Sequence, residues 1–249
     1  MLVLSKSWIR GFMRKDGVYV KGHNTKTQAA AVEPPKPVKH HVKTDDAGKR
    51  VAVKHPTEPS HKRTWDMPEA VATFTPAGDH PRGLGSVPFK AWTDTPKTKG
   101  GWNYVDGINY ELREKPLTVP PGKHPAAGVI IEEDDGRVWL VTPTNAFGGY
   151  QNTFPKGTCE KGLSMQANAI KEAWEESGLQ VQITGVLGDF ERTTSVARMY
   201  TARRTGGNPV DMGWESQAVR LVPKHKLKEL LNMEPDQNII ESYLSRKKE

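Results

Sequence analysis

The positions of hydrophobic residues along the 249-residue chain predict where its ordered elements lie. Residues 1 to about 80 contain few apolar residues and show no sustained period of 2 or 3.6. Later in the chain, alternating or continuous apolar runs predict strands, because side chains in a strand point to opposite faces in turn. The predicted strands cover residues 126–133, 137–142, 181–190, 195–203 and 217–222.

Start and stop signals place three helices. Ser164 can cap the first turn of a helix that runs to about residue 177, and Gly178 stands where a C-terminal glycine belongs. Prolines suit the first turns of helices over residues 224–231 and 236–244. Hairpins and helices alternate irregularly along this part of the chain. The pattern favours the α/β class, as an α/β/α sandwich with a mixed sheet, over a doubly wound parallel sheet.

Composition divides the chain into three regions. Residues 1–82 are basic and rich in Pro, Lys and His, and we expect them to be largely disordered. Residues 83–119 bring aromatics into a Pro/Gly-rich stretch, which predicts an extended segment packed on the domain. Residues 120–249 are the predicted domain. Hydrophobic residues, glycine not counted, are 35% of the whole, a low share for a globular chain, which fits a region that joins no core.

The N-terminal region is uniform except for one segment. Residues 31–54 are expected to be disordered or extended, because they cannot bury enough apolar surface to offset chain entropy. In residues 8–23, by contrast, Asp16-Gly17 lies between two runs of apolar and basic residues. That arrangement predicts a β-hairpin, which would need a partner because an isolated hairpin is marginally stable in water.

Net positive charge is concentrated in the N-terminal region. Residues 1–63 hold 14 Lys and Arg against 5 Asp and Glu, whereas the remainder holds 22 against 24. The net charge of +7 is therefore a property of the N-terminal quarter, and an anionic partner such as nucleic acid is expected for this tail only.

Cysteine usage and hydropathy bear on the cellular compartment of the protein. The one cysteine, Cys159, allows neither an internal disulfide nor a cysteine-based metal site, and it suits a reducing compartment. No run approaches the roughly 20 apolar residues of a membrane helix, so we expect no membrane partner. The expected location is the cytoplasm.

Three glutamates gather on one face of the helix predicted over 164–177. At about 100° per residue, Glu172, Glu175 and Glu176 lie opposite Ile170 and Ala173. The cluster is explained either by a solvated acidic surface or by divalent cations that neutralise it. Carboxylate oxygens suit Mg²⁺ or Mn²⁺, and Mg²⁺ also takes phosphate oxygens as ligands.

The flanks of the helix decide between these explanations. The segment GTCEKGLSMQANAIKEAWEESGL, residues 157–179, resembles the Nudix box, in which a glycine, five residues, a glutamate and seven residues precede R-E-U-x-E-E-x-G-U, with U aliphatic. The positions in register are Gly157, Glu172, Glu175, Glu176, Gly178 and Leu179. Leu163 replaces the first glutamate and Lys171 replaces the arginine. Over roughly half its length the chain is thus similar to Nudix hydrolases, and a Nudix-like sandwich is expected for residues 120–249.

The resemblance implies a metal-dependent hydrolase of a nucleoside diphosphate linked to another moiety, with Mg²⁺ or Mn²⁺ as cofactor. The implied metal ligands are Glu172, Glu175, Glu176 and the Gly157 carbonyl. Glu172, Glu175 and Lys171 are implied catalytic residues, although a lysine lacks the planar fork of an arginine. Glu215, in a later loop, is either the general base or a loop residue without a role. The family also implies a homodimer.

Candidates for substrate binding lie outside the box. Phe147 and Tyr150 stand beside glycines and can stack on a base, and Lys156 and Arg192 can meet phosphate. Further phosphate candidates are Arg198, Arg203 and Arg204.

Two other functions stay open. Leu163 and Lys171 are compatible with a non-catalytic, nucleotide-binding Nudix-fold module. The basic tail, with aromatics interleaved, is compatible with nucleic-acid binding as the main function.

Overall fold

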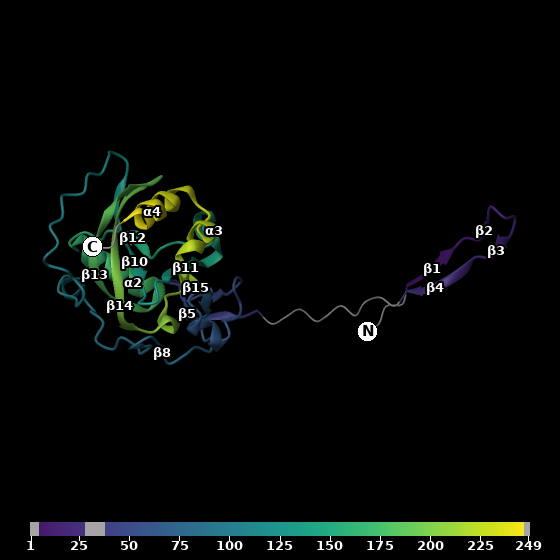
Figure 1. Cartoon of the computed structure of the whole chain (residues 1–249), viewed down its shortest axis with the longest axis horizontal. Helices are drawn as coiled ribbons and strands as arrows, with labels where there is room; N and C mark the ends of the chain where they lie inside the picture. Colours follow the sequence, from purple (N-terminus) through teal and green to yellow (C-terminus); the bar gives the residue numbers. More distant parts are fainter. Residues whose placement is uncertain (1–4, 28–37, 247–249) are drawn as a thin grey trace. The chain divides into compact units, whose positions relative to one another are not determined.

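The computed structural model describes residues 5–27 and 38–246, and the chain divides into two compact units, Met1–Pro37 and Val38–Glu249. The first unit contains a hairpin (Figure 1). Strand β1 (Ser5–Ile9) pairs antiparallel with β4 (His23–Thr27), and β2 (Phe12–Met13) pairs antiparallel with β3 (Tyr19–Val20). The hairpin predicted for residues 8–23 is therefore confirmed. Residues 28–37, which include the first part of the stretch 31–54 expected to be disordered or extended, lie outside the described residues.

The second unit is built on a seven-stranded sheet of order β13-β14-β10-β11-β15-β7, with β12 also paired to β10. Strand β10 runs parallel to β14, and the other pairs are antiparallel, so the sheet is mixed as predicted. The strands are β7 (Ala72–Phe74), β10 (His124–Glu132), β11 (Val138–Pro143), β12 (Lys156–Thr158), β13 (Leu179–Glu191), β14 (Ser195–Gly207) and β15 (Ser216–Val222).

Helices cover both faces of the sheet, which makes the α/β/α sandwich. Helix α2 (Met165–Ser177) packs Ile170 and Ala173 into the core on one face. Helices α3 (Leu227–Leu230) and α4 (Glu234–Ser245) contribute to a second core on the other face. In Figure 1, α4 and α2 lie on opposite sides of β10 and β12.

Local signals set the ends of α2 as predicted. The Ser164 hydroxyl accepts a hydrogen bond of 3.1 Å from the Ala167 N–H, which satisfies one of the first-turn donors. Gly178 ends the helix at φ 70°, a left-handed conformation that favours glycine. A side chain at Gly178 would also overlap the Asn208 carbonyl. The glutamate-bearing helix is therefore fixed at both ends.

The ordered domain begins earlier than residue 83, and this corrects the expectation that residues 1–82 are largely disordered. Strands β5 (His40–Thr44) and β6 (Arg50–Ala52) pair, and β7 joins β15 at the sheet edge. Trp65 and Phe74 are fully buried, with ring centroids 4.3 Å apart. Two large aromatic rings bury as much surface as several small apolar residues, so an average over a Lys- and Pro-rich stretch conceals them.

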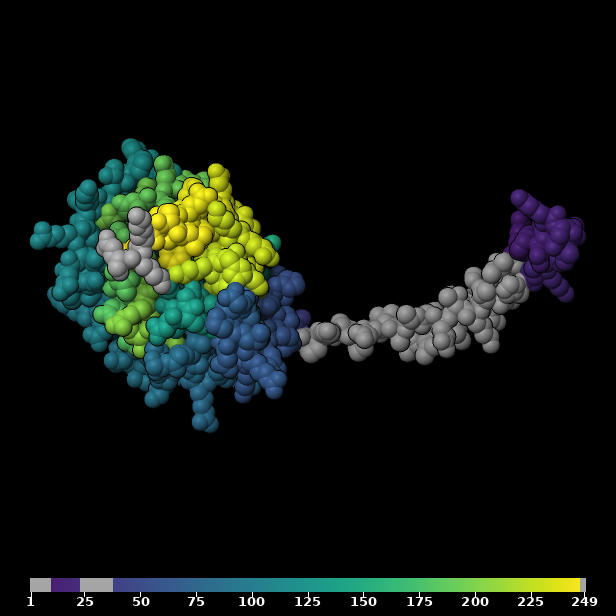
Figure 2. Space-filling view, viewed as in Figure 1, coloured from purple at the N-terminus to yellow at the C-terminus, as the bar shows by residue number. Residues whose placement is uncertain are grey.

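A buried arginine ties this early segment to the sheet. Arg137 is 1% exposed and donates hydrogen bonds to the main-chain carbonyls of Thr64, Trp65 and Met67. Figure 2 shows the described residues of 38–74, in blue, on the surface beside the C-terminal segment in yellow-green. There His225 Nδ1 lies 3.6 Å from Glu69 Oε2.

Residues 83–119 wrap the α2 side of the domain. Phe89, Trp92 and Trp102 are buried in the same core as α2. The rings of Trp92 and Trp102 lie 5.8 Å apart, edge to face, and both lie within 6.4 Å of the Trp174 ring on α2. The short elements here are β8 (Gly83–Leu84), β9 (Val87–Pro88) and α1 (Lys99–Trp102).

Short 3-10 turns complete the chain: η1 (Lys62–Asp66), η2 (Thr144–Gly149), η3 (Pro209–Asp211) and η4 (Lys224–Lys226). Turn η4 leads directly into α3, so the helix predicted over 224–231 is part 3-10 and part α. Among the helices in residues 38–246, none is long and apolar enough to cross a lipid bilayer.

Candidate active site

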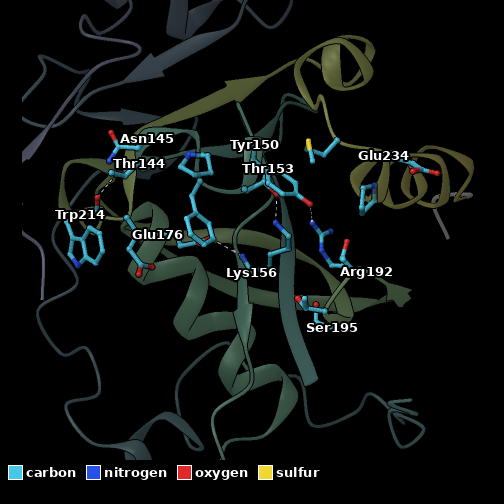
Figure 3. A pocket seen from close by; sticks show the side chains of 18 residues that line it. Thr144, Asn145, Tyr150, Thr153, Lys156, Glu176, Arg192, Ser195, Trp214 and Glu234 are labelled. Atoms are coloured by element: carbon cyan, nitrogen blue, oxygen red, sulfur yellow. Dashed lines mark hydrogen bonds between the residues drawn. The ribbon is translucent and has the colours of Figure 1, made fainter. Parts of the chain in front are cut away.

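A cavity of about 910 Å³ opens beside the end of α2 (Figure 3). Its walls come from η2, β12, the connection between β13 and β14, the loop before β15 and the start of α4. It brings together six of the ten predicted site residues: Phe147, Tyr150, Lys156, Glu176, Arg192 and Glu215. The other four, Gly157, Lys171, Glu172 and Glu175, lie outside its lining.

Cations occupy one part of the cavity. Arg192 forms an ion pair of 2.9 Å with Asp236, which is fully buried, and donates a second hydrogen bond to the Tyr150 hydroxyl. The guanidinium carbon of Arg192 lies 5.5 Å from the centre of the Tyr150 ring, and Lys156 Nζ lies 5.2 Å from it. The Tyr150 ring thus lies at cation–π distance from two cations in this structure.

Lys156 lies between Glu176 and Arg192 in the cavity (Figure 3). Its ammonium group donates to the Thr153 hydroxyl. Burial lowers the pKa of Lys156, and the negative charge of Asp236 opposes that effect. Arg192 acts in the same direction as burial. A further anion in the cavity would stabilise the charged form of this lysine.

Glu176 faces the cavity from the last turn of α2. Its Oε2 accepts a hydrogen bond of 2.9 Å from the Lys156 main-chain N–H. Burial raises the pKa of Glu176, the Lys156 charge opposes this, and the Glu172 charge adds to it. The carboxylate is therefore held in place while its charged form is disfavoured.

Glu172 lies against Gly157, one turn earlier on α2. A side chain at Gly157 would overlap the Glu172 carboxylate, which explains why a glycine stands there. Burial raises the pKa of Glu172 to about 7, and the charge of Glu175 adds to the effect. Burial raises the pKa of the nearby Cys159 thiol to about 11, and the Glu172 charge adds to the effect. Cys159 packs against the core as a small apolar residue.

Lys171 joins two carboxylates at the edge of the glutamate cluster, those of Glu175 and Glu160. Its ammonium group lies 2.6 Å from Glu175 and 2.9 Å from Glu160. Burial lowers the pKa of Lys171, but the hydrogen bonds with Glu175 and Glu160 outweigh this and raise it. Leu163, at the position of the missing glutamate, packs against the core instead. Glu160 thus supplies the second carboxylate for this lysine.

The donor set fits a divalent cation, although the carboxylates are not gathered around one point. Within residues 5–27 and 38–246, no group of three or more His, Cys, Asp or Glu is arranged to hold a metal ion. The fit rests on chemistry: Glu172 and Glu176 are hard oxygen donors whose charged forms are disfavoured by burial, with the Glu175 charge adding to this for Glu172 and the Glu172 charge for Glu176. Rotation of the Glu175 side chain away from Lys171 would add a third donor.

Glu215 lies at the exposed edge of the cavity. Its main-chain carbonyl accepts a hydrogen bond of 2.7 Å from the Thr144 N–H, which ties the loop before β15 to η2. Partial burial raises the pKa of Glu215, and the charges of Asp46 and Glu175 add to this. Phe147, at the other side of that link, is 82% exposed at the cavity edge.

Two of the three remaining arginine candidates are buried in ion pairs. Arg198 pairs with Asp189 at 2.7 Å and with Glu114 at 3.1 Å, and buried Arg204 pairs with Glu133. Arg203 donates to the Gln182 side chain. The buried ion pairs correct the expectation that Arg198 and Arg204 meet phosphate, whereas for exposed Arg203, whose partner is a neutral amide, that role stays a prediction.

Sequence reasoning missed Asp236, Trp214 and Asp46. Asp236 follows Pro235 in the first turn of α4, where an acidic residue is ordinary, so nothing in the sequence marked it as the partner of Arg192. Asp46 reaches the cavity loop through its contact with Trp214, from 168 residues away. Contacts between such distant positions leave no local pattern.

Comparison with known proteins gives a family match and several similar structures. The family model described as the NUDIX domain matches residues 122–243. A NUDIX hydrolase from Nitrosomonas europaea is 17% identical, with 49% of this chain and 89% of that chain covered and a TM-score of 0.43. An ADP-ribose pyrophosphatase from Streptococcus suis is 20% identical, with 50% and 93% covered and a TM-score of 0.40.

An Ap4A hydrolase from C. elegans is 16% identical, with 49% and 96% covered and a TM-score of 0.41. The search of curated proteins finds no match. The matched residues span the whole glutamate-bearing helix and both strands that flank it in the chain. Through residues 122–243, this chain belongs to the Nudix family.

Proposed function

We propose that the chain is a Mg²⁺- or Mn²⁺-dependent hydrolase that cleaves the diphosphate of a nucleoside diphosphate linked to another moiety. One observation carries the proposal: a single cavity is lined by the carboxylates of Glu176 and Glu215 and by the cations of Lys156 and Arg192. Diphosphate hydrolysis needs both kinds of group, because the phosphates must be neutralised and a water must be activated. Membership of the Nudix family supports the same reaction class.

The proposed roles follow from position. Lys156 and Arg192 bind phosphate oxygens, and Phe147 stacks on the base from the cavity edge. Glu172, Glu175 and Glu176, with the Gly157 carbonyl, hold the cation. When bound, the cation neutralises phosphate charge and lowers the pKa of a coordinated water.

Glu215 is the proposed general base. It lies on the same cavity as Glu176, and its raised pKa brings it closer to neutral pH, where a base works best. Lys171 acts as a positioning residue in the resting protein, because it directs the Glu175 carboxylate. Phosphate bound in the cavity would add negative charge beside Lys156 and so stabilise the protonated form of this lysine.

A substrate screen tests the proposal. The full chain is incubated with Mg²⁺ and ADP-ribose, dinucleoside polyphosphates or dNTPs, and the products are separated by ion-exchange chromatography. Glu176→Gln is expected to lower turnover by about 100-fold or more, because removing one charged group from a metal-assisted step has effects of this order. Glu234→Gln is the matched control, since it removes a carboxylate from the same cavity but from α4. No turnover on any substrate would contradict the proposal.

A non-catalytic nucleotide-binding module is the second candidate. The ion pair of Lys171 with Glu175 favours it, because this carboxylate already has a cationic partner in the absence of a metal ion. This candidate predicts calorimetric binding of a nucleotide at the cavity without turnover, and Arg192→Met would abolish the binding. Location in the cytoplasm and homodimer formation are further proposals, tested by cell fractionation and by light scattering.

A further inference from the structure

The hairpin of the first unit carries exposed apolar side chains that the proposed hydrolase reaction does not use. Phe12 is 56% exposed, Met13 65%, Val18 54% and Tyr19 63%. Four large apolar side chains so close together in the sequence form an exposed patch on a very small element. Such patches on soluble elements mark interaction sites.

The apolar side chains are divided between the two faces of the hairpin. Phe12 is opposite Val20, and Met13 is opposite Tyr19. Opposed residues of an antiparallel pair project to the same face, and successive residues project to opposite faces. Each face of the hairpin therefore presents one aromatic ring.

The Tyr19 ring lies along the hairpin instead of standing away from it. A methyl group added at Gly11 would be 2.5 Å from the Tyr19 hydroxyl oxygen, so the hydroxyl end of the ring lies over Gly11. Because Tyr19 is nevertheless 63% exposed, one side of the ring faces solvent. A flat exposed ring is the platform on which a nucleobase stacks.

Cationic residues flank the aromatic residues in the sequence of the hairpin. Arg10, Lys15 and Lys21 are exposed, and in the described hairpin none of them has a carboxylate within ion-pair distance. The one acidic residue between 10 and 22, Asp16, pairs with Arg14 at 3.3 Å. The hairpin therefore has three cations for an anionic ligand.

The arrangement distinguishes between classes of ligand. A membrane would require the apolar residues to enter first, but residues 14–16 at the tip are Arg, Lys and Asp. A protein groove would require one continuous apolar face, whereas the apolar side chains here are shared by both faces. Single-stranded nucleic acid fits, because its bases stack on separate rings while its phosphates meet cations between them.

We propose that this hairpin is a binding site for single-stranded nucleic acid, in which bases stack on Phe12 and Tyr19 and phosphates pair with Arg10, Lys15 and Lys21. The site adds to the proposed hydrolase function and does not depend on it. Duplex DNA or RNA offers no free base faces, so its affinity for the hairpin should be lower.

Fluorescence anisotropy of the full chain with a labelled single-stranded 20-mer of mixed sequence, as RNA and as DNA, tests the site. Tyr19→Ala and Phe12→Ala are each expected to weaken binding about fivefold or more, the effect of losing one base–aromatic stack. If the three cations contact phosphates, affinity should fall roughly 20-fold between 50 and 200 mM salt. Lys15→Ala with Lys21→Ala should flatten that salt dependence.

Matched variants keep the test independent of folding. Tyr19→Phe and Phe12→Tyr retain a ring and should bind as the unchanged chain does, whereas the alanine variants should not. Equal binding by the ring-retaining and alanine variants would overturn the proposal. So would a duplex of the same length that binds as tightly as the single strand, or binding to vesicles of phosphatidylserine and phosphatidylcholine with none to RNA or DNA.

Discussion

The indole N–H of Trp214 donates a hydrogen bond of 3.2 Å to Oδ1 of Asp46, so the loop of the proposed base is joined to the turn between β5 and β6. Two other contacts act beside it. Lys43 donates to the Asp211 carbonyl, and the Lys54 N–H donates to Gln217 Oε1 at 2.5 Å. A segment that precedes the Nudix domain in the chain thus holds the cavity loop from outside.

Removal of this link should impair turnover. Asp46→Ala is expected to lower kcat/KM about fivefold, because one hydrogen bond contributes about 1 kcal/mol to the position of the loop. Steady-state kinetics on the substrate found in the screen measures the effect. Asp45→Asn, in the same turn, is the control because the Asp45 side chain accepts hydrogen bonds from main-chain N–H groups of its own turn. Equal loss in both variants would contradict a specific role for Asp46.

The same residue should influence the pH profile. Partial burial raises the pKa of Glu215, and the Asp46 charge raises it further. Asp46→Asn keeps the acceptor for Trp214 but removes the charge, so the Glu215 pKa should fall. Because a general base works only when deprotonated, the acidic limb of kcat/KM against pH should move to lower pH. An unchanged limb would mean that Glu215 is not the base.

Lys171 should be replaceable by arginine but not by an uncharged residue. Lys171→Met leaves Glu160 and Glu175 without the cation that now joins them. We expect about a tenfold loss of kcat, with at most about 1 kcal/mol lost from the free energy of unfolding, since the pair is partly exposed. Lys171→Arg should restore kcat. Lys161→Met, an exposed lysine of the preceding loop, serves as the control.

The pair of Arg192 with Asp236 should contribute to both stability and binding. Asp236→Ala leaves a largely buried guanidinium without its carboxylate, which should lower the free energy of unfolding by about 3 kcal/mol. Urea denaturation measures this loss. The double variant Arg192→Met with Asp236→Leu should be more stable than Asp236→Ala, because no unpaired charge remains. If the double variant is less stable, the explanation from unpaired charge is wrong.

His41 should make the domain less stable in acid. It is buried, its Nδ1 accepts from the Lys43 N–H at 2.9 Å, and its Nε2 has no hydrogen-bond partner among the described residues. Burial lowers its pKa in the folded state, so the unfolded chain binds the proton more tightly. Stability should therefore fall as the pH drops through the unfolded value near 6.5.

Urea denaturation at pH 7.5 and 5.5 checks this effect. His41→Asn retains a side-chain acceptor and cannot be protonated in this range, so its loss of stability on acidification should be smaller than that of the unchanged chain. His55→Asn, at a more exposed position, is the control. Parallel losses in the chain and in His41→Asn would rule out His41 as the cause.

Local sequence was sufficient to predict those elements whose structure depends on residues close together in the chain. Ser164 and Gly178 fix the ends of α2, and the helical period places Glu172, Glu175 and Glu176 away from the core. The turn at Asp16-Gly17 likewise predicts its hairpin, because turn geometry is decided by those residues themselves.

Contacts between distant segments were not predictable in the same way. Nothing around Phe74 indicates that it pairs with Val219 on β15. The side-chain rotamers of the site depend on the same kind of contact: Glu175 turns toward Lys171, and Arg198 toward Asp189. Periodicity predicts the face of the helix or strand from which a side chain projects. The rotamer of that side chain depends on packing against distant residues, which the pattern does not encode.

The position of β7 at the edge of the sheet has a practical consequence for any shortened form of the protein. A fragment restricted to the family-matched residues 122–243 would lose β7, Trp65 and the carbonyls that Arg137 binds. The edge of β15 would then offer unpaired main-chain groups beside the uncovered Trp139 ring, a combination that promotes aggregation between copies. A truncated protein intended for crystallisation should accordingly retain residues from about 38 onward.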